Sequence, residues 1–291
     1  MTPAQSGHLA MLLFSMLVAG SFALGVLAAN DIAPAVLNAL RFWIAAVLVG
    51  AAAAFAGQLR LQFFQAPWRY FMMAAFLATY FVMMFEGLKT ANPVSAAAVF
   101  TLTPIMSGLF GWLLMRQKMT GRIALALGIG AIGAVWVIFR ADVAALLRFD
   151  VGRGEMIYFI GCVAHAIYTP LVPKMNRGEP TVVFTFGTLV AGAIILTVWG
   201  WPEMQATQWN ALPNIVWITI LYTAIFASAM TFVLLQFGAM RLPSSKVMAY
   251  TYLTPTWVIV WTLFLGAAAP TPLVLVGVAA TVLALVMLLR D

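Results

Sequence analysis

The chain has 291 residues, of which 64% are hydrophobic and 8% are charged, and its formal net charge is +7. An ordinary soluble domain is ~45–50% apolar and ~25% charged, and 15 basic plus 8 acidic residues cannot cover the surface of a globule this large. The composition therefore excludes a soluble globular protein, a nucleic-acid-binding protein, a disordered chain and a secreted disulfide scaffold. It leaves an integral membrane protein, in which the basic excess belongs to cytoplasmic loops.

Ten continuous apolar stretches of about twenty residues follow one another along the chain, and a helix of that length crosses the ~30 Å hydrocarbon core. Strands of an outer-membrane barrel would instead alternate apolar and polar residues. We therefore expect an all-α polytopic membrane protein. The predicted spans are 7–28, 32–56, 68–88, 93–115, 122–139, 154–173, 181–200, 213–237, 244–265 and 270–289. The long connection 140–153 mixes arginine and aspartate with apolar residues, which fits either an interfacial helix or a solvated loop.

Basic residues divide unevenly between the two sets of connections, which predicts the orientation. With a cytoplasmic N-terminus, the inner side carries Arg60, Arg69, Arg116, Lys118, Arg122, Lys174, Arg177, Arg241, Lys246 and Arg290. The outer side carries Lys89, Arg140, Arg148 and Arg153. We therefore expect both termini on the cytoplasmic side.

A shift of 151 residues places Leu102-Thr103-Pro104 on Leu253-Thr254-Pro255, and Phe81-Val82 on Phe232-Val233. The chain is therefore predicted to consist of two five-span units, 1–140 and 154–291, joined by 141–153. Five spans are an odd number, so the second unit must be inverted. Inverted repeats are typical of secondary transporters that hold substrate near the midplane.

Pro104 and Pro255 occupy the middle of the fourth and ninth spans, where each lacks an N–H and clashes with the carbonyl four residues back. The carbonyls of Phe100 and Thr251 are thereby released at membrane depth. The two kinks are either tolerated and satisfied by neighbouring helices or serve as hinges beside the transport pathway.

Few ionisable residues lie within the predicted spans. Arg41 has either a structural role near the outer interface or a place in the pathway. Glu86 is expected to pair with Lys89 at an interface, and Lys246 anchors the inner end of span nine or borders the pathway. His165 is the one deep group with an ordinary pKa near neutrality, although a buried histidine that a neighbouring group satisfies is the favoured interpretation.

Several helix faces combine aromatic, methionine and hydroxyl side chains, which suits a ligand with an apolar body and a few polar groups. Helix packing and interfacial belts account for part of this pattern. The candidate cavity residues are Ser21, Thr79, Tyr80, Met83, Phe100, His165, Tyr168, Phe226, Met230, Tyr250 and Trp257. No phosphate-binding loop, dinucleotide fingerprint, metal-ligand cluster or catalytic triad spacing is present in the sequence. We expect no enzyme activity, no cofactor and no metal.

Gly20-Ser21, Leu40-Arg41-Phe42, the two Leu-Thr-Pro motifs and the glycine-rich fifth span in this order resemble the EamA type of the drug/metabolite transporter superfamily. The resemblance covers essentially the whole chain and is nearest to the bacterial aromatic amino-acid exporter branch. It implies a basket in which spans 1, 3, 4, 6, 8 and 9 surround a central cavity. Two departures are Arg116-Gln117-Lys118 where many relatives carry a glutamate, and a first span without the carboxylate of small multidrug members.

The favoured function is export of amino acids or related small metabolites across the bacterial inner membrane by alternating access. One alternative keeps the fold but transports nucleotide sugars or phosphorylated metabolites, for which the sequence offers only Arg41 and Lys246. The other is a membrane-embedded enzyme or receptor. The expected partners are a small-molecule substrate and the lipid bilayer, with no nucleic acid, and a monomer is favoured over an oligomer.

Overall fold

The computed structural model describes residues 2–117, 120–148 and 150–289. Within these residues the chain forms helices and no strands. The long elements, in chain order, are α1 (Pro3–Ala28), α2 (Pro34–Phe55), α3 (Trp68–Leu88), α4 (Pro93–Phe100), α5 (Thr103–Met115), α6 (Gly121–Ile138), α8 (Arg153–Met175), α9 (Thr181–Trp199), α11 (Asn214–Ala224), α12 (Thr231–Ala239), α13 (Ser244–Ala249), α14 (Thr254–Phe264) and α15 (Pro272–Leu289). Lys118 and Arg290, both counted above as inner-face charges, lie outside the described residues.

Short elements complete the chain: η1 (Leu61–Phe64), α7 (Val143–Leu147), α10 (Trp201–Ala206), η2 (Trp209–Ala211), the π-helical turn η3 (Ile225–Met230) and the 3₁₀ turn η4 (Tyr250–Leu253). Three predicted spans are composites: α4 with α5, α11 with η3 and α12, and α13 with η4 and α14. The described residues thus contain ten helical segments long and apolar enough to cross a membrane, which confirms the predicted polytopic all-α class.

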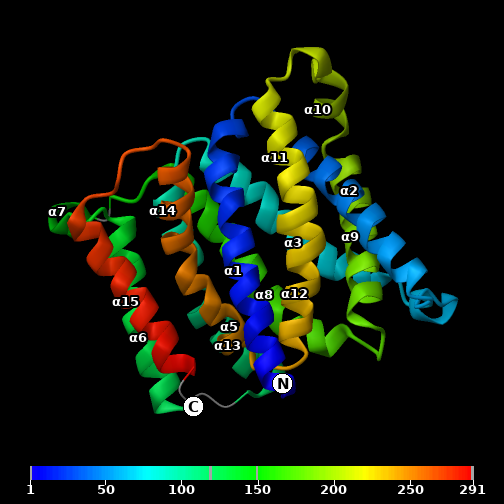
Figure 1. Cartoon of the computed structure of the whole chain (residues 1–291), viewed down its shortest axis with the longest axis horizontal. Coiled ribbons are helices and arrows are strands. Elements are labelled where there is room, and N and C mark those ends of the chain that lie inside the picture. The colour runs from blue at the N-terminus through cyan, green and yellow to red at the C-terminus, as the bar shows by residue number, and fades with distance from the viewer. Residues whose placement is uncertain (1, 118–119, 149, 290–291) are drawn as a thin grey trace.

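The neighbour relations between spans are preserved when spans 1–5 are exchanged with spans 6–10. Span 3 packs on span 6 as span 8 packs on span 1, and span 4 packs on span 6 as span 9 packs on span 1. Three pairs map onto themselves: α2 with α9, α6 with α15, and the interrupted spans 4 and 9. In Figure 1, α6 and α15 close one end of the molecule and α2 and α9 the other.

The two units run in opposite directions. Figure 1 shows that α1 begins and α15 ends at the lower face, whereas α8 begins at the upper face after α7. A chain of ten spans therefore brings both termini to one face, as an inverted repeat of five spans requires.

Segment 140–153 folds partly into the one-turn helix α7. Asp142 caps it, because its Oδ1 accepts hydrogen bonds from the backbone N–H groups of Ala144 and Ala145 at 2.8 and 3.1 Å. The helix lies at the upper face beside α15 (Figure 1). Its only turn exposes Val143 and Leu147, so the segment combines both predicted forms, a short helix within an exposed connection.

Glycines permit the closest helix contacts. A Cβ on Gly133 of α6 would lie 2.6 Å from the carbonyl oxygen of Gly277 on α15, and one on Gly277 would lie 2.8 Å from the oxygen of Gly133. Gly87 of α3 and Gly154 of α8 approach each other in the same reciprocal way. Close backbone approach through small residues is the usual means of packing helices in lipid.

Candidate functional site

The centre of the molecule is filled by a cluster of rings from α1, α3, α4 and α8, here called the central aromatic cluster. Its members are Phe22, Tyr80, Phe100, Tyr158, His165 and Tyr168, all of them buried. The rings of Tyr80 and His165 are 4.5 Å apart, and those of Phe100 and His165 are 5.5 Å apart. The structure therefore brings together four predicted cavity residues, Tyr80, Phe100, His165 and Tyr168.

His165 is 3% exposed and lies between the rings of Tyr80, Phe100 and Tyr168. Its Nδ1 is buried and has no hydrogen-bond partner among the described residues. Buried polar atoms in proteins are normally paired, so an unpaired one needs an explanation. An unmet hydrogen-bonding group among rings is suited to a ligand that carries a polar group on an apolar body.

The interrupted spans 4 and 9 meet beside this cluster. Thr103 Oγ1 of α5 lies 3.3 Å from Thr251 Oγ1 of η4, and the same Thr103 hydroxyl donates to the carbonyl of Phe100 at 2.6 Å. The carbonyl of Thr251 accepts the backbone N–H of Thr254. Both carbonyls that the prolines release are therefore satisfied locally.

The prolines end one helix and start the next instead of kinking a continuous one. Pro104 lies in the first turn of α5 and Pro255 in the first turn of α14. A first-turn N–H has no partner within its helix, so proline is tolerated there. Each span consequently consists of two half-helices joined by a non-α turn, which is a natural place for bending.

Arg41 lies in the interior of the bundle, between α2, α3 and η3. Its side chain is fully buried. Its Nε donates to Ser228 Oγ, its Nη1 to Asn38 Oδ1 at 3.3 Å, and its Nη2 to the carbonyl of Ala227 at 2.5 Å. The guanidinium carbon also lies 3.8 Å from the centroid of the Phe81 ring.

Phe226 and Met230 lie on the outer surface, 39% and 45% exposed, and not on the inward face that regular α-helical spacing places them on. The reason is the π-helical turn η3, which holds more residues per turn than an α-helix. The buried face of span 8 therefore passes through Thr223, Ala227 and Ser228.

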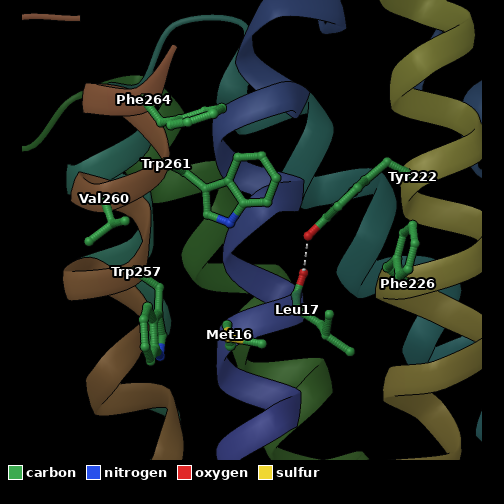
Figure 2. A pocket seen from close by; sticks show the side chains of 8 residues that line it. All are labelled: Met16, Leu17, Tyr222, Phe226, Trp257, Val260, Trp261 and Phe264. Atoms are coloured by element: carbon green, nitrogen blue, oxygen red, sulfur yellow. Dashed lines mark hydrogen bonds between the residues drawn. The ribbon is translucent and has the colours of Figure 1, made fainter. Parts of the chain in front are cut away.

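Trp257 and Phe226 line an apolar groove of about 380 Å³ on the outside of the bundle. Figure 2 shows the groove between α14, α1 and the α11–η3 segment, with Trp261 and Tyr222 facing each other across α1. The Tyr222 hydroxyl donates to the carbonyl of Leu17 at 2.9 Å. The candidate cavity residues predicted from helix faces therefore belong to two different places. Some lie in the central aromatic cluster, whereas Phe226 and Trp257 lie in this surface groove.

The remaining candidates lie apart from the cluster or at its edge. Ser21 is buried in α1 and its Oγ has no partner among the described residues, whereas Thr79 and Met83 are partly exposed on α3. The hydroxyl of Tyr250 lies 3.2 Å from Nδ1 of His8. Lys246 is partly exposed in α13.

Glu86 forms the predicted pair with Lys89, at 2.6 Å and partly exposed. A second pair was not expected from the sequence: Arg69 of α3 contacts Glu179 in the α8–α9 connection at 2.5 Å, and both side chains are buried. Arg69 also donates to the carbonyl of Met175 at 2.6 Å. This pair therefore fixes the start of α3 to the loop that precedes α9.

Burial raises the pKa of the Glu179 carboxyl, but the hydrogen bonds from the Arg69 guanidinium and from the backbone N–H of Arg177 outweigh it and hold that pKa below its usual value. Glu179 is thus ionised in the folded protein. No group of three or more metal-ligating side chains occurs within the part of the chain that the structure describes.

Sequence reasoning missed four residues that complete these sites. Tyr158, whose hydroxyl lies 3.0 Å from that of Tyr80, stands seven residues before His165 and so shares its helix face. Asn38 stands three residues before Arg41 on the same face. Phe22 and Ser228 carry no such periodic signal, because the first belongs to an almost uniformly apolar helix and the second to the π turn.

The EamA-like transporter family matches the chain twice, over residues 5–139 and 152–290. The chain belongs to this family. An uncharacterized transporter of Bacillus subtilis (strain 168), YyaM, is 25% identical over 191 residues, which span 66% of this chain and 61% of that protein. A solved structure, described only as a crystal structure of a protein, superposes with a TM-score of 0.73 at 22% identity and covers 98% of this chain and 95% of its own. This EamA-like protein is therefore a multi-pass membrane protein, and its fold is that of the solved structure.

Proposed function

We propose that this EamA-like protein is a secondary transporter that exports amino acids, above all aromatic and other apolar ones, or related small metabolites. The observation that carries the proposal is the meeting of the two interrupted spans beside the central aromatic cluster. Thr103 and Thr251 mark the breaks, and their hydroxyls are 3.3 Å apart. Repeat-related broken helices at midplane depth are where secondary transporters place substrate sites.

We infer alternating access from the same arrangement. Each unit contributes one broken span, so bending at one break opens the path to one face while the other break stays closed. In this proposal the two bends act toward opposite faces, because the units are inverted. Related arrangements of packed helices tend to be bistable rather than continuously deformable.

The substrate class rests on the chemistry of the centre. Six rings form an apolar surface with the Tyr80 and Tyr158 hydroxyls, the His165 nitrogen and the nearby Arg41 guanidinium as its polar groups. Such a mixture favours a small molecule with an apolar or aromatic body. Nucleotide sugars and phosphorylated metabolites would need several basic groups, and within the described spans only Arg41 lies fully buried near the cluster.

We further propose that the protein resides in the bacterial inner membrane with both termini in the cytoplasm. The greater number of basic residues at that face supports this orientation. A reporter that is active only in the cytoplasm should be active when it is fused to the C-terminus. Activity of a reporter that works only in the periplasm would contradict the orientation.

The test of function is efflux from proteoliposomes that contain the purified protein. The panel consists of labelled aromatic and aliphatic amino acids, a sugar phosphate, a nucleotide sugar and a lipophilic cation. We expect flux of aromatic amino acids above that of empty liposomes and no flux of the phosphorylated compounds. Flux confined to phosphorylated compounds would favour the alternative substrate class, and no flux of any compound would contradict a transporter of this kind.

A further inference from the structure

We propose that Arg41 binds the carboxylate of the transported molecule, at a site beside the π-helical turn η3. The inference rests on the proposed transport function and names the group that recognises the substrate's charge. It depends on the burial of the guanidinium, on its uncommitted donors, and on its position beside the central aromatic cluster.

The charge of Arg41 has no acidic partner in the described structure. Glu86 pairs with Lys89 and Glu179 with Arg69, and no described carboxylate contacts Arg41. The partners of the guanidinium are two neutral side chains and one carbonyl. A cation at membrane depth without a counter-charge is expensive and is retained for function, so a ligand that brings one negative charge would stabilise this site.

The donors of Arg41 are only partly used. A guanidinium has five N–H donors, and the described contacts use one on each of the three nitrogens. One N–H on Nη1 and one on Nη2 have no described acceptor. Two donors on the terminal nitrogens of one guanidinium can bind both oxygens of a carboxylate. A single fork without a second basic group suits a carboxylate better than a phosphate dianion.

The surroundings of Arg41 lead directly to the central aromatic cluster. Its guanidinium lies over the Phe81 ring, the Phe81 and Tyr80 rings are 4.6 Å apart, and the Tyr80 ring is 4.5 Å from that of His165. A carboxylate on Arg41 would therefore place the body of the molecule beside the rings of Phe81 and Tyr80, the second of which contacts the His165 ring.

The π turn supplies the partners that Arg41 holds. Ser228 Oγ and the Ala227 carbonyl both belong to η3, the one π-helical turn in the described part of the chain. π turns inside helices are frequent at functional sites. Because these two groups are neutral acceptors, a carboxylate competes with them favourably for the guanidinium.

Three ligands that share one phenyl body test the proposal: L-phenylalanine, L-phenylalaninamide, which lacks the carboxylate, and 3-phenylpropanoate, which lacks the amine. Binding to the detergent-solubilised wild-type protein and flux in proteoliposomes are measured for each. We expect phenylalanine and 3-phenylpropanoate to bind at least tenfold more tightly than the amide. In Arg41→Gln the ratio of carboxylate affinity to amide affinity should fall to near one. Arg41→Lys keeps the charge but not the fork, so its ratio should lie between those of the wild type and Arg41→Gln.

Arg241→Gln is the matched control, because Arg241 is exposed and its guanidinium also lies over a phenyl ring, that of Phe237, at 3.5 Å. It should keep the wild-type ratio. The comparison of ligands on the wild-type protein does not depend on whether a variant folds. Equal binding of phenylalanine and its amide to the wild type would overturn the Arg41 assignment while leaving transport intact. A ratio preserved in folded Arg41→Gln would also overturn it.

The two proposals fail in different ways. Flux of 3-phenylpropanoate without flux of any amino acid, lost in Arg41→Gln, would contradict the amino-acid assignment and retain Arg41 as the carboxylate site. Flux of the amide alone would overturn both.

Discussion

Arg41 and Arg69 are both buried, but their surroundings differ. Arg69 is neutralised by Glu179 and fixes a loop, whereas Arg41 has only neutral partners and faces the aromatic centre. Removing one partner of a buried ion pair leaves an uncompensated charge, so the first site is expected to govern stability. At the second site no described carboxylate neutralises the Arg41 guanidinium, so this site is expected to govern substrate recognition.

The Arg69–Glu179 pair predicts a pH dependence of stability. Arg69 holds the Glu179 pKa below its usual 4.5, so the pair's contribution is complete above that value and is lost as the pH falls through the lowered pKa of the folded state. Glu179→Gln should reduce the free energy of unfolding by about 3 kcal/mol at pH 7. Denaturation in detergent at pH 7 and at pH 3 measures both effects.

The difference between wild type and Glu179→Gln should shrink at the lower pH. Glu203→Gln, at an exposed acidic position of α10, serves as the control and should leave stability unchanged. Equal stability of Glu179→Gln and wild type at pH 7 would contradict this account.

His165 leads to a prediction about energy coupling. Rings surround it, and no described carboxylate contacts it, so a proton on this imidazole would be unfavourable. We therefore expect facilitated export down the substrate gradient. An imposed pH gradient across proteoliposomes should not drive uphill accumulation. Accumulation against the gradient that disappears in His165→Ala or Glu86→Gln would instead identify a proton antiporter.

At the scale of elements, the broken spans and the glycine contacts have opposite mechanical roles. Spans 4 and 9 are interrupted at the centre, whereas α6 and α15 pack in close contact at one end of the molecule (Figure 1). Movement is expected at the breaks, and the α6–α15 pair is expected to move as one unit.

Pro104→Ala and Pro255→Ala test the breaks. Alanine restores the missing N–H and removes the ring, so the two half-helices can join into a stiffer helix. The maximal rate of flux should fall by about tenfold, equivalent to ~1.4 kcal/mol in the barrier, with a smaller change in the apparent affinity. Pro272→Ala, in the first turn of α15, should leave the rate unchanged. Altered affinity at an unchanged rate would contradict the hinge role.

Gly133→Ala tests the α6–α15 contact. The added methyl group would lie 2.6 Å from the Gly277 carbonyl oxygen, and such overpacking should destabilise the protein by about 1–3 kcal/mol. Gly128 lies on the same helix with nothing within 4 Å of its Cβ position, so Gly128→Ala is the matched control. Thermal unfolding in detergent should separate the two variants. Similar melting temperatures would show that the helices do not rely on this approach.

At the scale of the whole molecule, the exchange of neighbours between the two units relates each contact in one half to a contact in the other. The family matches each unit once, over residues 5–139 and over residues 152–290. In the proposed mechanism, exchanging the conformations of the two inverted units would convert a state open to one face into a state open to the other.

Apolar length alone predicted the ten spans, because every backbone group in lipid must be paired within a helix. The repeated Leu-Thr-Pro motif predicted a kink in each of spans 4 and 9, since proline constrains the backbone locally, and the structure has a break between two helices at each place. Regular helix periodicity could not place Phe226 and Met230, because the π turn shifts the face of span 8. Nor could it predict the Arg69–Glu179 pair, since these residues are separated by 110 positions and meet only in the folded bundle.

The most direct test of the central claim is a counterflow measurement in proteoliposomes with no pH or ion gradient. Vesicles are preloaded with unlabelled phenylalanine, and labelled phenylalanine is added outside. A carrier whose single site faces each side in turn should accumulate label transiently above its equilibrium level and then release it. A monotonic approach to equilibrium with no overshoot, or no entry above empty liposomes, would contradict transport of aromatic amino acids by alternating access.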